Sequence, residues 1–208
     1  MTTKLYCFGE SGHSYKVALM LELCGLDWEP VHVDFFKGEA RSKEYGAVNP
    51  MQEVPVMIYD GKRYSQSGVM LDILTRDTGK FGPETEDERL EILRWILWDN
   101  HKLSAQLGAL RFQMNYLAEK YRSNDVRTFM AIRCRTSLNI LESHLYNRDW
   151  IACDRPTTAD FSCCSYLYYP EEFGFDRTKY PNIDAWLTRL SELPRWKHPY
   201  DLMQRAYA

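Results

Sequence analysis

The sequence lacks the long apolar run that a membrane protein needs. Its 208 residues contain no stretch near the roughly 20 consecutive apolar residues that span a bilayer, and no signal-type segment follows Met1. Blocks of one charge are also missing, because 26 Lys and Arg residues stand against 29 Asp and Glu residues, for a net charge of -3. We therefore expect a cytoplasmic protein that binds neither a membrane nor nucleic acid.

Cysteine pairs with the spacing of a metal or redox site are absent too. The six cysteines are scattered, with no C-x-x-C pair and no histidine spacing suited to zinc. Cys163 and Cys164 are neighbours in a helical stretch, where adjacent side chains point about 100° apart, which favours buried structural thiols over a redox pair. The sequence predicts no metal site.

The length and composition favour two modest domains. A chain with 45% hydrophobic and 26% charged residues can bury a core, and its length is comfortable for two domains. Residues 79–86 contain Gly79, Gly82 and Pro83 among charged residues, which is typical of a linker. We therefore expect one domain over residues 1–78 and a second over residues 87–208.

Strand and helix patterns alternate in the first domain and only helical patterns follow in the second. An Asp60-Gly61 pair between two short runs indicates a hairpin, and the order over residues 1–78 is βαβαββα. The second half has no comparable strand alternation. Its expected helices cover residues 87–119, 124–147, 157–169, 183–192 and 199–206.

A proline at the start of a strand is the most informative motif. A cis Val54-Pro55 bond costs only about 0.5–1 kcal/mol over trans and would turn the backbone of Val54 outward, where it can pair with an extended peptide. Taken alone, the motif favours an edge-strand proline without a role. Its significance for function depends on the other segments that lie close to it in the fold.

Two further segments suit the recognition of a small thiol peptide. Gln66-Ser67 opens a helix, whose N–H groups attract a carboxylate, although Ser67 alone could be a simple cap. Ser11, in the loop before the first helix, could donate a hydrogen bond to a thiolate and lower its pKa, although a Gly/Ser loop also suits any tight turn. Glutathione is a peptide with the required thiol and free carboxylate.

In combination these segments resemble the cytosolic glutathione transferases over essentially the whole chain. The resemblance runs from Ser11-Gly12-His13-Ser14 through Asn49-Pro50, Val54-Pro55-Val56 and Gln66-Ser67 to Pro156-Thr157-Thr158-Ala159-Asp160-Phe161, which looks like the family's capping box. It implies a thioredoxin-like α/β domain followed by an all-α helical bundle. It also implies a homodimer without a metal, with glutathione as co-substrate and a hydrophobic electrophile as its partner in a detoxifying conjugation.

The resemblance also assigns roles to individual positions. The loop is most similar to the serine and bacterial cysteine types, so Ser11 is the catalytic choice and His13 occupies the bacterial cysteine position. The other glutathione-binding positions are Gln52, Val54, Pro55, Gln66 and Ser67; Lys37, Arg41 and His101 are additional contacts; and Ser104, Leu107 and Arg111 are expected to line the electrophile pocket.

One departure and two alternatives accompany this interpretation. The family commonly has Gly-Lys or Gly-Gln before Val-Pro, and the Gln52-Glu53 of this chain places a carboxylate that we expect to oppose the glycine end of glutathione. Lys37, Arg41 or Gln52 could compensate. The chain could instead be a glutathione-dependent thiol reductase or peroxidase that uses Cys7, or a noncatalytic binding module that retains the scaffold.

Overall fold

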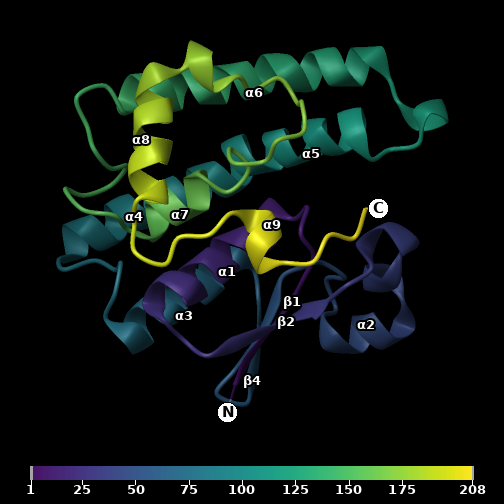
Figure 1. Ribbon diagram of the computed structural model, residues 1–208, viewed down its shortest axis with the longest axis horizontal. Helices are drawn as coiled ribbons and strands as arrows, with labels where there is room; N and C mark the ends of the chain where they lie inside the picture. Colours follow the sequence, from purple (N-terminus) through teal and green to yellow (C-terminus); the bar gives the residue numbers. More distant parts are fainter. Residues whose placement is uncertain (1, 208) are drawn as a thin grey trace. The chain divides into compact units, whose positions relative to one another are not determined.

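The computed structural model describes residues 2–207, which divide into two compact units (Figure 1). The first unit comprises the chain up to Gly82 together with the segment from Leu193 onward, and the second runs from Pro83 to Glu192. The sequence analysis assigns residues 87–208 to one helical domain, whereas residues 193–207 pack with the first unit, because they bond to the loop after its first strand.

A four-stranded sheet with the order β2-β1-β3-β4 forms the centre of the first unit. β1 (Thr3–Cys7) is parallel to β2 (Trp28–His32) and antiparallel to β3 (Val56–Tyr59), which pairs with β4 (Lys62–Ser65). Asp60 and Gly61 join β3 to β4 with φ angles of 48° and 71°, the positive values that a tight hairpin requires. The thioredoxin-like fold is thereby confirmed.

Helices flank this sheet in the expected order. α1 (Gly12–Cys24) packs against α3 (Ser67–Thr78), and both helices end at a left-handed glycine. Between β2 and β3 the chain forms the 3-10 turns η1 (Phe35–Lys37) and η2 (Glu39–Arg41) and then α2 (Lys43–Val48). The short helix α9 (Pro199–Leu202) contacts α1 from the C-terminal segment.

Side chains alternate between the two faces of the sheet. Leu5 pairs with Met57, and both are wholly buried. The neighbouring pair of Tyr6 and Val56 joins a separate cluster with Tyr45 of α2. Since successive residues of a strand point to opposite faces, each face of the sheet carries its own core, and α2 closes the one next to the loop that precedes β3.

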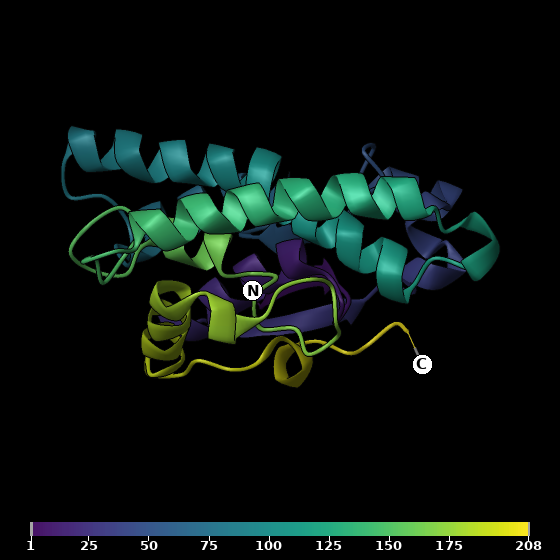
Figure 2. The ribbon, with the colours of Figure 1, turned by 90° about the horizontal axis from the view of Figure 1, so that it is seen from above.

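The second unit is helical throughout its regular structure. Its elements are α4 (Glu86–Trp98), the π-helical turn η3 (Asp99–Leu103), α5 (Ser104–Asn115), η4 (Glu119–Tyr121), α6 (Asn124–His144), α7 (Thr158–Cys163), η5 (Arg177–Lys179) and α8 (Pro181–Ser191). α6 runs along α5, against which it packs (Figure 2). The helix expected over residues 87–119 is interrupted by η3, where the hydrogen-bonding pattern widens.

Asp160 organises the second unit from the start of α7. The capping box with Thr157 is present as expected, and the carboxylate also accepts the backbone N–H of Ile151 at 3.0 Å and the indole N–H of Trp186 at 2.9 Å. Burial raises the pKa of Asp160, and these hydrogen bonds act in the opposite direction. The all-α bundle predicted from the sequence is confirmed.

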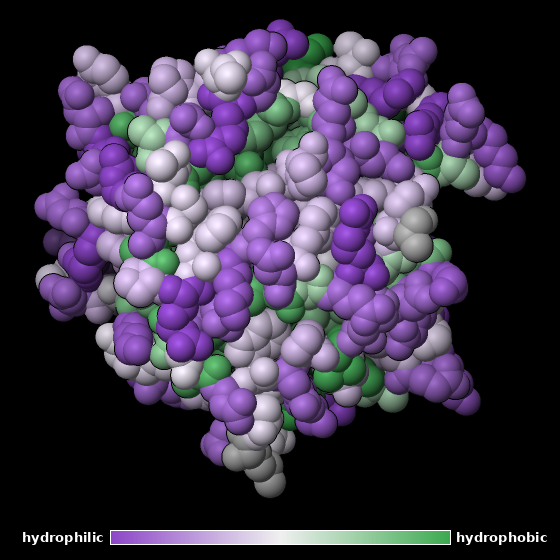
Figure 3. All heavy atoms as spheres, viewed as in Figure 1, coloured by the Kyte–Doolittle hydropathy of each residue, from purple (hydrophilic) through white to green (hydrophobic). Residues whose placement is uncertain are grey.

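The surface is largely polar on the face drawn in Figure 3, where apolar side chains form only small patches. Among residues 2–207 no helix combines the length and the apolar character needed to cross a bilayer.

Candidate functional site

The register of the sheet brings three of the predicted segments to one edge. Val56, the first residue of β3, pairs with Tyr6 near the end of β1 and with Ser65 at the end of β4. The loop after β1, the Val54-Pro55 pair before β3 and the start of α3 after β4 therefore leave the sheet side by side. Ser11, Val54 and Ser67 are thus carried on neighbouring segments of one unit.

Ser11 is the N-cap of α1 and is almost completely buried. Its Oγ accepts the backbone N–H of Ser14 at 3.1 Å, and its carbonyl accepts the first helical hydrogen bond from Tyr15. A hydroxyl that accepts through a lone pair keeps its own proton to donate. The capping role and the predicted donation to a thiolate are therefore compatible in one side chain.

The two neighbours that could replace Ser11 differ in their ionisation. His13 lies in the first turn of α1, and burial, assisted by the charge of Lys16, lowers its pKa to about 3. Its imidazole is therefore neutral at pH 7. Cys7 ends β1 with 1% of its surface exposed, and burial raises the pKa of its thiol to about 12, so this thiol is not a nucleophile at neutral pH.

A fixed loop leads into β3. The hydroxyl of Tyr45 at 3.0 Å and the side-chain amide of Asn49 at 2.8 Å both donate to the carbonyl oxygen of Glu53. Tyr45 and Asn49 are buried, so the position of Glu53 is held from beneath. The bond between Val54 and Pro55 that follows is cis, as the sequence predicts.

The start of α3 continues the same surface. Gln66 is the N-cap with a φ of 69°, and Ser67 is the first helical residue, with 5% of its surface exposed. The side-chain amide of Gln66 donates to Glu53 Oε2 at 3.2 Å and to the sulfur of Met51 at 3.3 Å. Glu53 is therefore in direct contact with a residue of the predicted site.

The residues expected to compensate for Glu53 are engaged elsewhere or point elsewhere. The ammonium of Lys37 pairs with Asp34 at 2.7 Å, and this contact raises the pKa of Lys37. Arg41 is an exposed residue at the end of η2. Gln52 has a φ of 54° and carries its amide toward Gly46 of α2. The compensation of Glu53 by any of these three residues stays a prediction.

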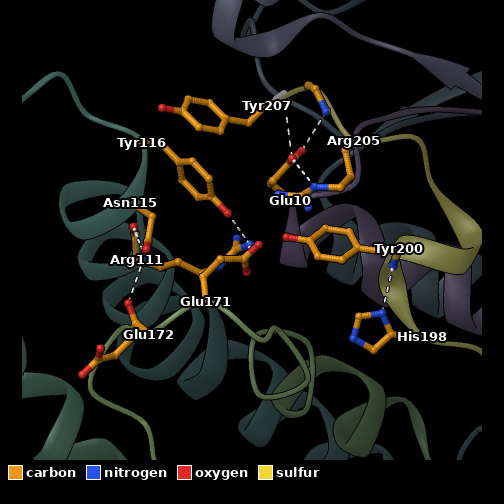
Figure 4. A network of polar contacts seen from close by, with 11 residues as sticks. Glu10, Arg111, Asn115, Tyr116, Glu171, Glu172, His198, Tyr200, Arg205 and Tyr207 are labelled. Carbon is orange, nitrogen blue, oxygen red and sulfur yellow. Dashed lines mark hydrogen bonds and ion pairs between the residues drawn. The ribbon is translucent and has the colours of Figure 1, made fainter.

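The predicted residues of the helical unit are mostly enclosed within it. Leu107 is core, and the hydroxyl of Ser104 donates to buried Asp99 at 2.6 Å and lies 3.1 Å from that of Ser165. Arg111, also buried, donates to Glu171 at 2.7 Å and to the hydroxyl of Tyr116 (Figure 4). His101 is exposed on η3. Their roles in a substrate pocket stay predictions.

Sequence reasoning missed Glu10, the residue before Ser11. Its buried carboxylate accepts from Arg205 Nε at 3.2 Å and from the backbone N–H groups of Ala206 and Tyr207 at 2.9 and 3.1 Å (Figure 4). Gly9 donates its N–H to Gln204 O at 2.7 Å. The C-terminal segment therefore fixes the loop that carries Ser11. A charge directly after a glycine was the only signal in the sequence, and it did not indicate a partner.

Within the part of the chain that the structure describes, no three His, Cys, Asp or Glu residues form a group able to hold a metal ion.

Comparison with known proteins identifies the family. Residues 10–77 match the glutathione S-transferase N-terminal domain, and residues 133–194 match the glutathione S-transferase C-terminal domain. A maleylacetoacetate isomerase of Rhizobium meliloti strain 1021 is 30% identical over 88% of this chain and 88% of its own. The chain belongs to the glutathione S-transferase family. The sequence analysis is confirmed on this point and on the class of enzyme, a glutathione transferase.

Other glutathione S-transferase relatives show how varied the family is. A disulfide-bond oxidoreductase of Escherichia coli K12 is 24% identical over 90% of this chain and 89% of its own. A crystal structure described as a possible glutathione S-transferase from Rhodopseudomonas palustris superposes with a TM-score of 0.89 at 28% identity, covering 96% of this chain and 90% of that one. An isomerase and an oxidoreductase among the relatives leave the individual reaction of this transferase open.

Proposed function

We propose that this glutathione transferase conjugates the thiolate of glutathione to hydrophobic electrophiles by substitution or addition. The observation that carries the proposal is the meeting of three segments at one sheet edge, with Ser11 capping α1, the cis Val54-Pro55 bond and the Ser67 end of α3. Membership of the family supports glutathione as the thiol.

Each segment is proposed to hold one part of the tripeptide. The backbone of Val54 pairs with the cysteinyl residue as an added strand would. The N–H groups at the start of α3, with the Ser67 hydroxyl and the Gln66 amide, receive the α-carboxylate of the γ-glutamyl residue. The remaining proposed contacts are Gln52, Pro55, Lys37, Arg41 and His101.

Ser11 is proposed to activate the thiol. A free thiol of pKa near 8.5 is mostly protonated at neutral pH, and a hydrogen bond from the Ser11 hydroxyl favours the thiolate and lowers that pKa. The thiolate then attacks the electrophilic carbon, and the leaving group or the adjacent π system takes the electron pair. His13 is uncharged at the same pH and could add a second donor through its N–H.

For the parts of the chain around the site, we propose the roles that the sequence analysis predicts. Residues 1–78 would bind glutathione, residues 79–86 would link the domains, and the helical part would supply the electrophile pocket with Ser104, Leu107 and Arg111. We also propose that the protein is a cytoplasmic homodimer.

No two of the six cysteines form a disulfide within residues 2–207, which fits a reducing compartment. Apolar side chains exposed on α4 and α6 fit an interface: Leu90, Leu93, Leu97, Phe129, Ile132 and Ile140.

The reductase alternative that uses Cys7 is disfavoured by the state of that thiol. A redox cysteine must reach its substrate as a thiolate, whereas Cys7 is buried and its pKa is raised to about 12. A noncatalytic module would retain the same fold and is separated from the proposal only by turnover.

Turnover of a chloronitroarene with glutathione tests the proposal. We expect the wild-type protein and Cys7→Ala to form the conjugate and Ser11→Ala to lose most of this activity, with circular dichroism showing that all three are folded. Glutathione binding without turnover of any electrophile tried would favour the binding module. Glutathione-dependent disulfide reduction that disappears in Cys7→Ala would favour the reductase.

A further inference from the structure

The contact between Glu53 and Gln66 changes the meaning of the unusual carboxylate before Val54-Pro55. Glu53 Oε2 lies 3.2 Å from Gln66 Nε2. Both side chains are exposed, and within residues 2–207 Glu53 forms no ion pair. The carboxylate is therefore directed to the N-cap of α3 and keeps its charge available to a ligand.

This placement is set by the backbone on both sides. The carbonyl of Glu53 is held by buried Tyr45 and Asn49, and the backbone of Gln66 is fixed because its carbonyl accepts the first hydrogen bonds of α3, from Val69 and Met70. The two side chains thus start from rigid points on adjacent segments. The fold therefore places the two side chains within reach of each other.

The chemistry of an amino-acid head group explains what such a charge can do. An α-carboxylate and an α-ammonium are attached to one carbon, so the groups that recognise them must lie within a few ångströms of each other. The start of α3 at Ser67 offers N–H groups to the carboxylate. Gln66 beside it is an uncharged amide and cannot balance an ammonium, whereas the Glu53 carboxylate in contact with it can.

We propose that Glu53 is the counter-ion of the α-ammonium of the γ-glutamyl residue, and this rests on the proposed binding of glutathione. The negative charge is supplied from the loop before β3 and acts beside Gln66. Glu53 thereby selects peptides with a free α-amino group. The expectation that its carboxylate opposes the glycine end is replaced by a favourable role at the opposite end of the tripeptide.

Because Glu53 is exposed to solvent, its charge can change the affinity for glutathione only modestly. Ion pairs in water are weak and are screened by salt, so we expect the charge to change affinity by roughly five-fold at low ionic strength and by less at high salt.

Calorimetric titration of the full chain with three ligands tests the proposal. These are glutathione, its analogue with glutaryl in place of γ-glutamyl, which lacks the α-amino group, and glutathione esterified at glycine. We expect the wild type to bind glutathione roughly five-fold more tightly than the glutaryl analogue, and Glu53→Gln to bind the two equally. The ratio between glutathione and its glycine ester is expected to be the same in both proteins.

Two further variants make the test specific. Glu44→Gln removes an exposed carboxylate from α2 of the same unit and is expected to leave the glutaryl ratio unchanged. Adding Gln66→Glu to Glu53→Gln returns a carboxylate to the neighbouring position and is expected to restore the preference for the amino group.

The outcomes separate the inference from the function on which it rests. An unchanged glutaryl ratio in Glu53→Gln would overturn the inference alone, as would a gain of affinity for glutathione but not for its glycine ester, which would reinstate repulsion at the glycine end. Failure of the folded wild type to bind any of the three ligands would overturn the proposed function and the inference with it.

Discussion

Glu10 and Arg205 stand 195 positions apart in the chain, and Arg205 Nε lies 3.2 Å from Glu10 Oε1. The carboxylate is buried, while the guanidinium is about half exposed and packs 4.5 Å from the ring centre of Tyr200 (Figure 4). Together with the two backbone N–H groups that Glu10 also accepts, this contact ties the end of the chain to the loop that carries Ser11.

Glu10→Gln is expected to destabilise the first unit. The amide keeps the size of the side chain but replaces a charged acceptor of three donors, and breaking such a buried arrangement costs about 2–4 kcal/mol. Urea unfolding of both proteins measures the loss. Asp72→Asn, which removes an exposed i,i+4 pair with Arg76, is the control and is expected to cost less than about 0.5 kcal/mol. Equal effects from the two substitutions would contradict the role of Glu10.

Gly9→Ala is expected to displace the C-terminal segment. A Cβ at Gly9 would lie 3.1 Å from Arg205 Cα and from its backbone nitrogen, so the backbone of one segment must move, at a cost of about 1–3 kcal/mol. Limited proteolysis followed by mass spectrometry should show faster cleavage after residue 200. In Gly46→Ala the new Cβ would meet only the end of the Gln52 side chain, at 3.6 Å, so its cleavage rate should match that of the wild type.

Ser11→Ala and Ser14→Ala are expected to differ in stability and in activity. Ser11 caps α1, and its loss costs about 1 kcal/mol. The hydroxyl of Ser14 is buried without a hydrogen-bond partner among residues 2–207, so its removal should be neutral or stabilising. Thermal unfolding tests this pair.

The same two variants separate the catalytic role from the cap. Loss of the Ser11 donor should lower kcat/KM with glutathione on the order of 10²-fold and move the alkaline rise of its pH profile toward the free thiol pKa of about 8.5. Ser14→Ala should keep the wild-type profile. A Ser11→Ala enzyme whose profile does not move would show that the hydroxyl acts only as a cap.

His13 gives a pH dependence of stability whose sign follows from its lowered pKa. An unfolded histidine titrates near pH 6.5, whereas the pKa of folded His13 is about 3, so on acidification the unfolded chain binds a proton first and is favoured. The stability that neutral His13 contributes to the folded state is fully present above pH 7 and is lost as the pH falls toward 3. We therefore expect the wild type to lose more unfolding free energy than His13→Gln between pH 7 and pH 5. The control is His101→Gln, because His101 is exposed. A loss of unfolding free energy in the wild type no greater than that in His13→Gln would refute the prediction.

The local parts of the fold could be predicted because their signals are local. The turn at Asp60-Gly61 requires positive φ angles that few residues adopt, and the Thr157 capping box closes within four residues. The cis bond of Val54-Pro55 is predicted from the residues next to it in the sequence. The order of elements in the first unit followed from these signals together with apolar periodicity.

The rest of the site depends on contacts that sequence spacing does not contain. Glu10 is bound by residues from the other end of the chain, and the contact of Glu53 with Gln66 follows from the pairing of Val56 with Ser65. The hydroxyl of Ser104 is bound to Asp99 across the π-helical turn, a contact that the spacing of its helix does not indicate. A smooth periodic pattern gave no sign of this interruption.

The partners of Glu10 are synthesised long after Glu10 itself, because they lie 195 to 197 positions further along the chain. At roughly 5–20 residues per second, the 195 positions between Glu10 and Arg205 correspond to about 10–40 seconds of translation. During that interval the newly made β1 and α1 carry a carboxylate that is still exposed to water. The loop that carries Ser11 can therefore be fixed only once residues 205–207 have been synthesised, long after β1 and α1.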